Sequence, residues 1–143
     1  MKPQNKINFV SMAGVMAVLF CFLASVVNAQ LPKGKPWNAP ESAVKMKNPN
    51  KVDDEFVAAG KTLYAKHCKS CHGSGGKGDG PKASGLDISS GDFTSEAFKA
   101  EPEGVVYWKT SEGRDPMPTF KKKTTDEERW QIVAYIATLG KKK

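Results

Sequence analysis

The sequence predicts a small all-α domain, because two segments carry strong helical patterns and no segment alternates convincingly enough to be a strand. Residues 53–67 and 125–140 place apolar side chains at steps of three and four, and both open with acidic side chains. Short helices are expected at residues 94–98 and 102–111. The remaining chain is rich in glycine and proline, which favour loops.

The first long helix is predicted to begin near Asp53, where acidic side chains complement the positive end of the helix dipole. It leads directly into Cys68. In its middle, Gly60 costs about 1 kcal/mol relative to alanine. We therefore expect another backbone to approach the helix closely at this glycine.

The last helix has the clearest start and stop signals. Thr125 and Glu128 match a capping box, with Thr124 and Glu127 as the alternative frame, and Gly140 is expected to end the helix. Two adjacent apolar stripes predict burial on most sides; they are Ile132, Tyr135, Ile136 and Leu139, and Trp130, Val133, Ala134 and Ala137.

The first 29 residues are typical of an export signal peptide. Lys2 and Lys6 form a basic start, Val10 to Val27 is almost entirely apolar, and cleavage after Ala29 is predicted from the small residues before it. An uncleaved anchor is the alternative, because 18 apolar residues just span a bilayer. Either way we expect an exported protein, in the periplasm or on the periplasmic side of the membrane.

Residues 30–50 form a proline-rich segment with no sustained period, which predicts an extended lead-in. Trp37 and Val44 are the side chains that could pin this lead-in onto the domain. The domain itself is predicted to span residues 51–143.

The chain of 143 residues is basic, with a formal net charge of +7 that falls to +5 when Lys2 and Lys6 leave with the signal peptide. A basic surface suits partners with acidic docking surfaces. Nucleic acid is another common partner of basic chains, but an exported protein rarely meets it. The alternative is that the surface lysines only confer solubility.

Cys68-Lys69-Ser70-Cys71-His72 matches Cys-x-x-Cys-His, the attachment signature of c-type haem. Thiols three positions apart can add to the two vinyl groups of one porphyrin, and the adjoining imidazole is then placed to ligate iron. The motif predicts one covalently attached haem c, bound through Cys68 and Cys71, with His72 as an axial iron ligand.

Other uses of these side chains fit less well. Zinc needs four ligands, but beyond the leader the only cysteines and histidines are His67, Cys68, Cys71 and His72, within one short segment. A thioredoxin-like cysteine pair opens a helix after a strand, whereas this pair follows a helix. A disulfide across two residues would be unusually tight and leaves His72 unexplained.

A sixth iron ligand must come from Met46, Met117 or His67, the remaining candidates beyond the leader. His67 immediately precedes the attachment motif, and Met46 belongs to the lead-in. Met117 lies between Pro116 and Pro118, whose fixed φ angles restrain the backbone. We predict Met117 as the ligand, because thioether and imidazole pair in cytochromes c, although methionines more commonly fill cores.

Five segments then point to one family: Cys68-Lys69-Ser70-Cys71-His72, Gly78-Asp79-Gly80-Pro81, Asp92-Phe93-Thr94, Met117-Pro118-Thr119-Phe120 and Trp130-Gln131-Ile132-Val133-Ala134-Tyr135-Ile136. From about Val52 to Leu139 the chain resembles the bacterial class I (mono-haem) c-type cytochromes. The resemblance implies a cytochrome c fold, in which the N- and C-terminal helices cross near Gly60 and Tyr135. Short helices and loops would wrap around one haem.

The resemblance also implies roles around the haem. The carbonyl of Pro81 would accept a hydrogen bond from His72, which fixes the ring and raises its basicity. Phe93, Trp108 and Phe120 resemble residues that wall the haem pocket, although each could equally be an ordinary core residue. The proline-rich lead-in departs from the family's pattern.

A closed, six-coordinate iron favours electron transfer. We expect a protein that is not an enzyme and carries single electrons between redox partners by outer-sphere transfer, or else the haem subunit of a larger dehydrogenase or respiratory complex. A catalytic or gas-sensing haem protein needs an open iron position, and Met117 argues against one. Lys69, Lys121, Lys122 and Lys123 predict a basic rim that docks an acidic partner. Membrane contact is expected only if the leader stays attached.

Overall fold

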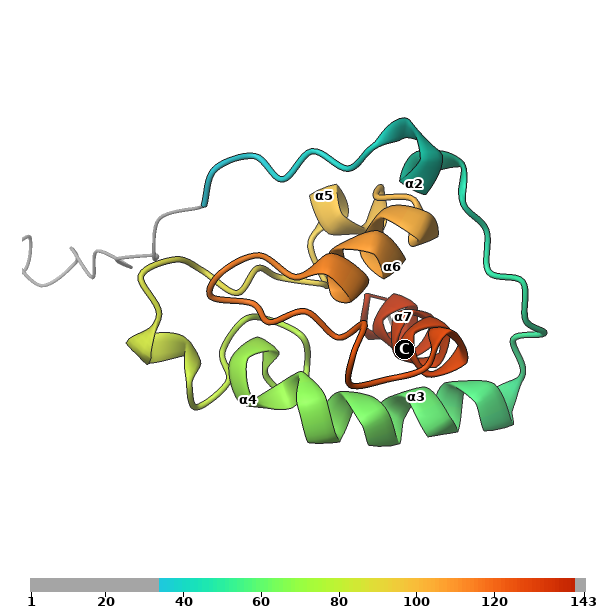
Figure 1. Ribbon diagram of the computed structural model, residues 1–143. Coiled ribbons are helices and arrows are strands. Elements are labelled where there is room, and N and C mark those ends of the chain that lie inside the picture. The colour runs from blue at the N-terminus through green and yellow to red at the C-terminus, as the bar shows by residue number, and fades with distance from the viewer. Residues whose placement is uncertain (1–33, 141–143) are drawn as a thin grey trace, which may run out of the picture. The chain divides into compact units, whose positions relative to one another are not determined.

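The computed structural model describes residues 34–140, which form helices joined by loops (Figure 1). The helices are α2 (Glu41–Lys45), α3 (Asp54–His67), α4 (Lys69–His72), η1 (Ala83–Gly85, a 3₁₀ turn), α5 (Glu96–Lys99), α6 (Glu103–Glu112) and α7 (Asp126–Leu139). Within these residues no strand forms, so the all-α prediction is confirmed there. No helix of this part of the chain is long and apolar enough to cross a membrane. The predicted leader lies outside the described residues.

Helices α3 and α7 pack across each other and form the base of the domain (Figure 1). Asp53 caps α3, since its carboxylate accepts a hydrogen bond from the backbone N–H of Phe56 at 3.1 Å. A Cβ atom at Gly60 would lie 1.9 Å from the carbonyl oxygen of Gln131 and 3.1 Å from the Cβ of Tyr135. The expected close approach at Gly60 is confirmed, and it fixes where the two helices cross.

Helix α7 begins with the capping box in the predicted frame: the hydroxyl of Thr125 accepts from the backbone N–H of Glu128, and the carboxylate of Glu128 accepts from the backbone N–H of Thr125. Its two apolar stripes enter two buried clusters. These clusters are Trp130 and Val133 with Phe56 and Val106, and Ile132 and Ile136 with Tyr64 and Cys68.

The lead-in differs from the extended segment that its sequence predicts. Its residues 41–45 form α2, which packs against α6. Ala43 is fully buried there, and a Cβ atom at Gly104 would lie 2.3 Å from the Ala43 carbonyl oxygen. Val44 points outward and is 44% exposed, so it does not pin the segment. A single helical turn is too short to show a period, which is why the sequence gives no sign of it.

The two short helices lie close to their predicted positions. α5 begins at Glu96, because the side chain of Ser95 accepts from a backbone N–H of its first turn. α6 runs from Glu103 to Glu112, with Pro102 at the capping position rather than inside the first turn. Differences of one or two residues at helix ends leave the architecture unchanged.

Candidate functional site

The attachment motif occupies the short turn that follows α3. Cys68 separates α3 from α4, and the backbone N–H groups of Cys71 and His72 donate to the carbonyl of Cys68 at 3.2 and 3.0 Å. The buried hydroxyl of Tyr64 donates to the carbonyl of Gly73 at 2.7 Å, which holds the chain as it leaves the motif. One helical turn thus holds both thiols and the imidazole in place.

Met117 lies on a tight loop between α6 and α7. The backbone N–H of Arg114 donates to the Met117 carbonyl at 2.8 Å, and the N–H of Met117 donates to the Arg114 carbonyl at 2.7 Å. Beyond it, the Thr119 hydroxyl donates to the carbonyl of Ser111 at 2.6 Å. Hydrogen bonds on both sides therefore fix the backbone that carries the thioether.

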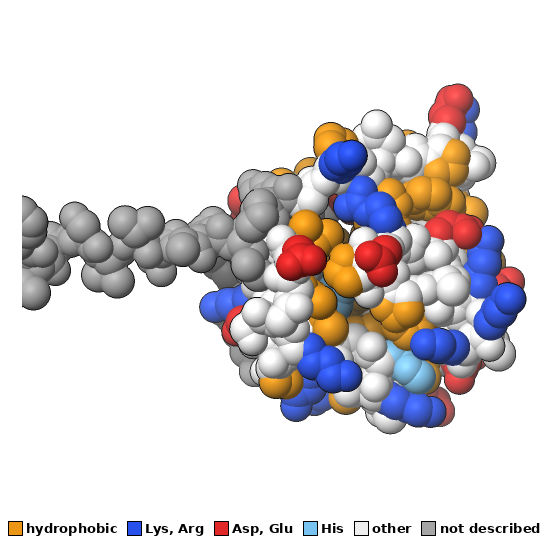
Figure 2. Space-filling view, turned by 60° about the vertical axis from the view of Figure 1, so that its left-hand side comes forward, with side chains coloured by type: hydrophobic (Ala, Val, Ile, Leu, Met, Phe, Trp, Pro, Cys, Tyr) orange, Lys and Arg blue, Asp and Glu red, His pale blue; other side chains and the backbone are white. Residues whose placement is uncertain are grey.

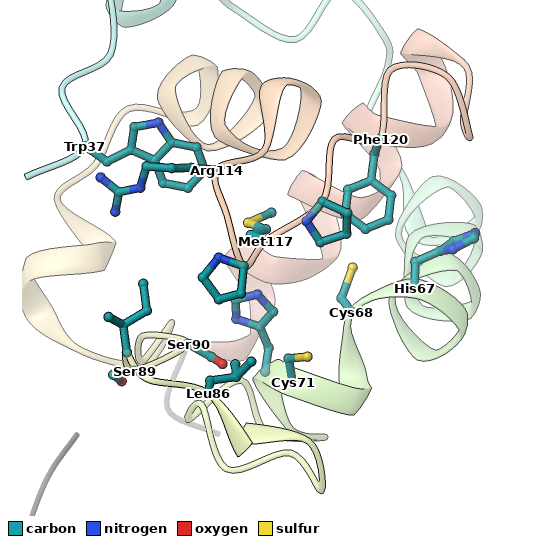
Figure 3. Close-up of a pocket in the computed structure, with 14 residues that line it drawn as sticks. Trp37, His67, Cys68, Cys71, Leu86, Ser89, Ser90, Arg114, Met117 and Phe120 are labelled. Atoms are coloured by element: carbon teal, nitrogen blue, oxygen red, sulfur yellow. The ribbon is translucent and has the colours of Figure 1, made fainter. Parts of the chain in front are cut away.

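These two segments face the same space. A cavity of about 130 Å³ is lined by Cys68, Cys71, His72 and Met117 together (Figure 3). A second cavity, of about 200 Å³, reaches toward the core and shares Cys68, His72 and Met117 with the first. The side chains predicted to attach and ligate a haem therefore meet at one cleft, although Met117 follows His72 by 45 positions in the sequence.

Burial controls the protonation of the site. It lowers the pKa of His72 to about 4, against a smaller opposite effect of a hydrogen bond with the backbone of Ser90, so the imidazole is neutral. Burial, with a smaller contribution from Cys71, raises the pKa of the Cys68 thiol to about 12. This is the opposite of the lowered pKa that thiol–disulfide exchange uses. Cys68 and Cys71 are free thiols here, without a disulfide between them.

The His72 ring is held by stacking, and one of its nitrogens is buried without a hydrogen bond. Its ring stacks on Phe93, with the centroids 4.5 Å apart, and its Nδ1 is buried without a hydrogen-bond partner. The expected bond from His72 to the Pro81 carbonyl is not formed in this structure. A buried, unpaired ring nitrogen is costly unless another group satisfies the ring.

The residues present fit haem c. Two thiols can form the covalent links, a neutral imidazole and a thioether are the axial donors of cytochromes c, and the cleft around them is apolar. Among residues 34–140, no three His, Cys, Asp or Glu side chains lie close enough together to hold a metal ion by themselves.

The predicted aromatic wall needs one correction. Phe120 lines the first cavity and Phe93 lines the second. Trp108 lines neither of them; it packs against Trp37, with ring centroids 6.0 Å apart, and Trp37 takes the lining position. His67 also reaches the first cavity, where its ring meets that of Phe120 edge to face at 5.8 Å.

The predicted basic rim is only partly arranged as expected. Lys69, Lys121, Lys122 and Lys123 are all exposed. The ammonium of Lys123 lies 5.8 Å from the centre of the Phe120 ring, which lines the first cavity. Lys121 forms an ion pair with Glu112, which reduces the positive charge that it contributes.

Sequence reasoning considered Trp37 only as an anchor of the lead-in and did not single out Arg114, but both line the first cavity (Figure 3). The contact of Trp37 with Trp108 agrees with the anchoring role. A lone tryptophan in a polar, proline-rich segment is a usable signal, since so large an apolar side chain seldom stays unburied. Arg114 stands three positions before Met117. A basic side chain so close to the predicted ligand is a second signal that the sequence offers. Leu86 and Ile88 complete the apolar lining.

Comparisons with known proteins agree with this site. A family model described as cytochrome c matches residues 57–140, more than half of the chain. No curated protein sequence gives a significant match. A solved structure, the reducing HAO-like protein complex of Kuenenia stuttgartiensis, contains a chain with 29% sequence identity and a TM-score of 0.60. The match covers 99% of this chain and 65% of that one, so this chain spans about 65% of the length of that relative.

Proposed function

Because the chain belongs to the cytochrome c family, we propose that it is a mono-haem electron carrier whose iron is held between His72 and Met117. One observation carries the proposal: the thiols of Cys68 and Cys71, the His72 imidazole and the Met117 thioether line a single cavity. Haem c, when bound, supplies an iron that accepts and releases one electron at a time.

The chain's own residues prepare the site for this role. Cys68 and Cys71 provide the covalent attachment, and the neutral imidazole of His72 is ready to donate to iron. Met117 would supply the second protein ligand of the iron, which would leave no site for a substrate. Phe120 and Trp37 add large apolar side chains to the lining of the cleft.

The experiment for the carrier function combines a haem count with voltammetry on the purified, exported protein. We expect one covalently attached haem per chain and a single reversible one-electron wave. The reduced protein should not bind carbon monoxide under native conditions, because Met117 occupies the sixth position. Rapid carbon monoxide binding without denaturant would contradict a closed iron and favour a catalytic or gas-sensing role.

A basic rim beside the cleft would dock an acidic redox partner. Figure 2 shows a face with hydrophobic side chains at its centre and several basic side chains around them, with a few acidic ones among them. Lys123 lies beside the cleft, because its ammonium contacts the ring of Phe120. Steering by such charges raises association rates, and the effect weakens as salt rises.

A matched pair of charge reversals tests the rim. Lys123→Glu should slow electron exchange with an acidic partner protein severalfold at low salt and reduce the salt dependence of the rate. Lys47→Glu changes the net charge by the same amount at an exposed position that lines neither cavity, and it should leave the rate nearly unchanged. Equal effects of the two variants would mean that only overall charge matters.

A second candidate function is an electron-transfer subunit of a larger redox complex. The observation that favours it is the likeness, over nearly the whole chain, to part of an HAO-like protein complex. Native gel filtration of extracts, followed by haem staining, separates the two functions. A free carrier elutes at the mass of the single chain, whereas a subunit elutes with a larger partner.

We also propose export to the periplasm with cleavage after Ala29. The basic start, apolar stretch and small residues before the cleavage point support it. Mass spectrometry of the mature protein should show Gln30 at its N-terminus. A mature chain that keeps Val10 to Val27 would favour the membrane-anchored alternative.

A further inference from the structure

The lead-in crosses the loop that carries Met117, and a single arginine joins the two. The Nη1 of Arg114 donates to the carbonyl oxygens of Lys35 and Pro36 at 2.8 and 3.2 Å. Its guanidinium carbon also lies 4.6 Å from the centre of the Trp37 ring, which is the distance of a cation–π contact. Arg114 therefore holds three successive residues of the lead-in.

The backbone of the same arginine holds the ligand loop. Arg114 and Met117 exchange two backbone hydrogen bonds, at 2.8 and 2.7 Å. Any movement of the loop that withdraws Met117 from the cleft must displace Arg114 or break these bonds. The side chain of Arg114 resists such displacement as long as the lead-in stays in place.

Trp37 also contacts two side chains of α6. It meets the ring of Trp108, in α6, edge to face at 6.0 Å, and the ammonium of Lys109 lies 5.9 Å from its centre. Trp37 lines both cavities together with Met117. Figure 3 shows Trp37 and Arg114 together on one side of Met117, opposite the side of Cys68 and His67.

We propose that Lys35, Pro36 and Trp37 form a strap that keeps the Met117 loop closed over the cleft, with Arg114 and Trp37 as positioning residues for the axial methionine. The proposal rests on the proposed function only in taking Met117 as the iron ligand. It gives the lead-in, which departs from the family's pattern, a role in the site. The strap acts by raising the free energy of the open loop, because opening breaks charge-assisted hydrogen bonds and exposes an aromatic ring.

The test uses the mature holoprotein and imidazole as an external ligand for the oxidised iron. Imidazole can bind only when Met117 has moved away, so its apparent affinity reports the fraction of molecules with an open loop. In Arg114→Lys, which keeps the charge but loses the planar fork, we expect that affinity to rise at least about tenfold. Trp37→Ala should have the same effect. Lys47→Ala removes an exposed lysine of the lead-in outside the strap and should match the wild type.

Hydrogen exchange at the backbone amide of Met117 measures how often the loop opens, and this measurement does not depend on iron ligation. In both variants this amide should exchange about tenfold faster, while the amide of the buried Ile132 keeps its wild-type rate. Unchanged exchange at Met117, or equal acceleration at Ile132, would overturn the strap. If exchange accelerates at Met117 alone but the wild type lacks methionine ligation, the strap stands and the ligand assignment fails.

Discussion

Replacing Gly60 by alanine tests the helix crossing on which the site is built. The added methyl group would lie 1.9 Å from the carbonyl oxygen of Gln131 and 2.5 Å from its carbonyl carbon. Both atoms belong to the backbone of α7, so no side-chain rotation relieves the contact. The two helices must move apart, and the contacts of Tyr64 with Ile132 and Ile136 lie in the same interface.

The expected cost follows from two opposing effects. Overpacking of a core costs typically 1–3 kcal/mol. A clash with backbone atoms should cost about 3 kcal/mol, because the backbone cannot rotate away as a side chain can. Alanine gains about 1 kcal/mol over glycine in a helix interior. The net loss of unfolding free energy is therefore about 2 kcal/mol, which corresponds to a fall in Tm of about 8 °C for a domain of this size.

Thermal unfolding of the holoprotein, followed by circular dichroism, measures this loss. Gly85→Ala is the matched control, since no atom lies within 4 Å of its added methyl group and its backbone needs no positive φ. The control should be neutral or slightly more stable, because alanine restricts the unfolded chain. A Gly60→Ala protein as stable as the wild type would refute the crossing that we describe.

Three further predictions concern stability. Thr125→Ala removes one half of the capping box of α7 and should cost about 1 kcal/mol in urea unfolding; no loss would mean that the helix starts elsewhere. Tyr64→Phe removes the 2.7 Å hydrogen bond to the buried carbonyl of Gly73 and leaves that oxygen only the longer bond of 3.4 Å from the backbone N–H of Gly76. It should cost about 1 kcal/mol, more than the control Tyr135→Phe, and equal effects would contradict a structural role for that bond. A backbone hydrogen bond from Phe56 lowers the pKa of Asp53 below its usual 3.8. Its stabilising effect is therefore present above pH 3.8 and is lost as pH falls through the folded-state pKa. In urea unfolding at a series of pH values, the free energy of unfolding should fall less steeply toward acid pH in Asp53→Asn than in the wild type.

Features with a strong local signal could be predicted from the sequence. The capping residues and the spacing of apolar side chains gave the two long helices nearly to the residue, and Gly60 indicated the crossing because glycine in a helix needs a reason. The attachment motif could be recognised and Met117 could be predicted as a ligand because few other candidate ligands exist in the chain. The structure then places those residues around one cleft.

Features that depend on contacts between distant segments could not be predicted in this way. The turn of α2 is held by the packing of Ala43 against Gly104. Neither residue carries a local sequence signal for that contact. The family resemblance assigned Trp108 to the pocket wall, and nothing in the sequence indicated Trp37 as a lining residue. Both are isolated tryptophans, and only the path of the lead-in across the ligand loop decides which of them faces the cleft.

The central claim is that Met117 and His72 hold one iron between them. The near-infrared absorption band of methionine-to-iron ligation in the oxidised protein tests it most directly, with Met46→Ala as the control, because Met46 packs against the core cluster that contains Phe56 and Trp130. We expect the band in the wild type and in Met46→Ala, and its loss in Met117→Ala with the covalent haem retained. A wild type without the band, or a Met117→Ala protein that keeps it, would contradict the account.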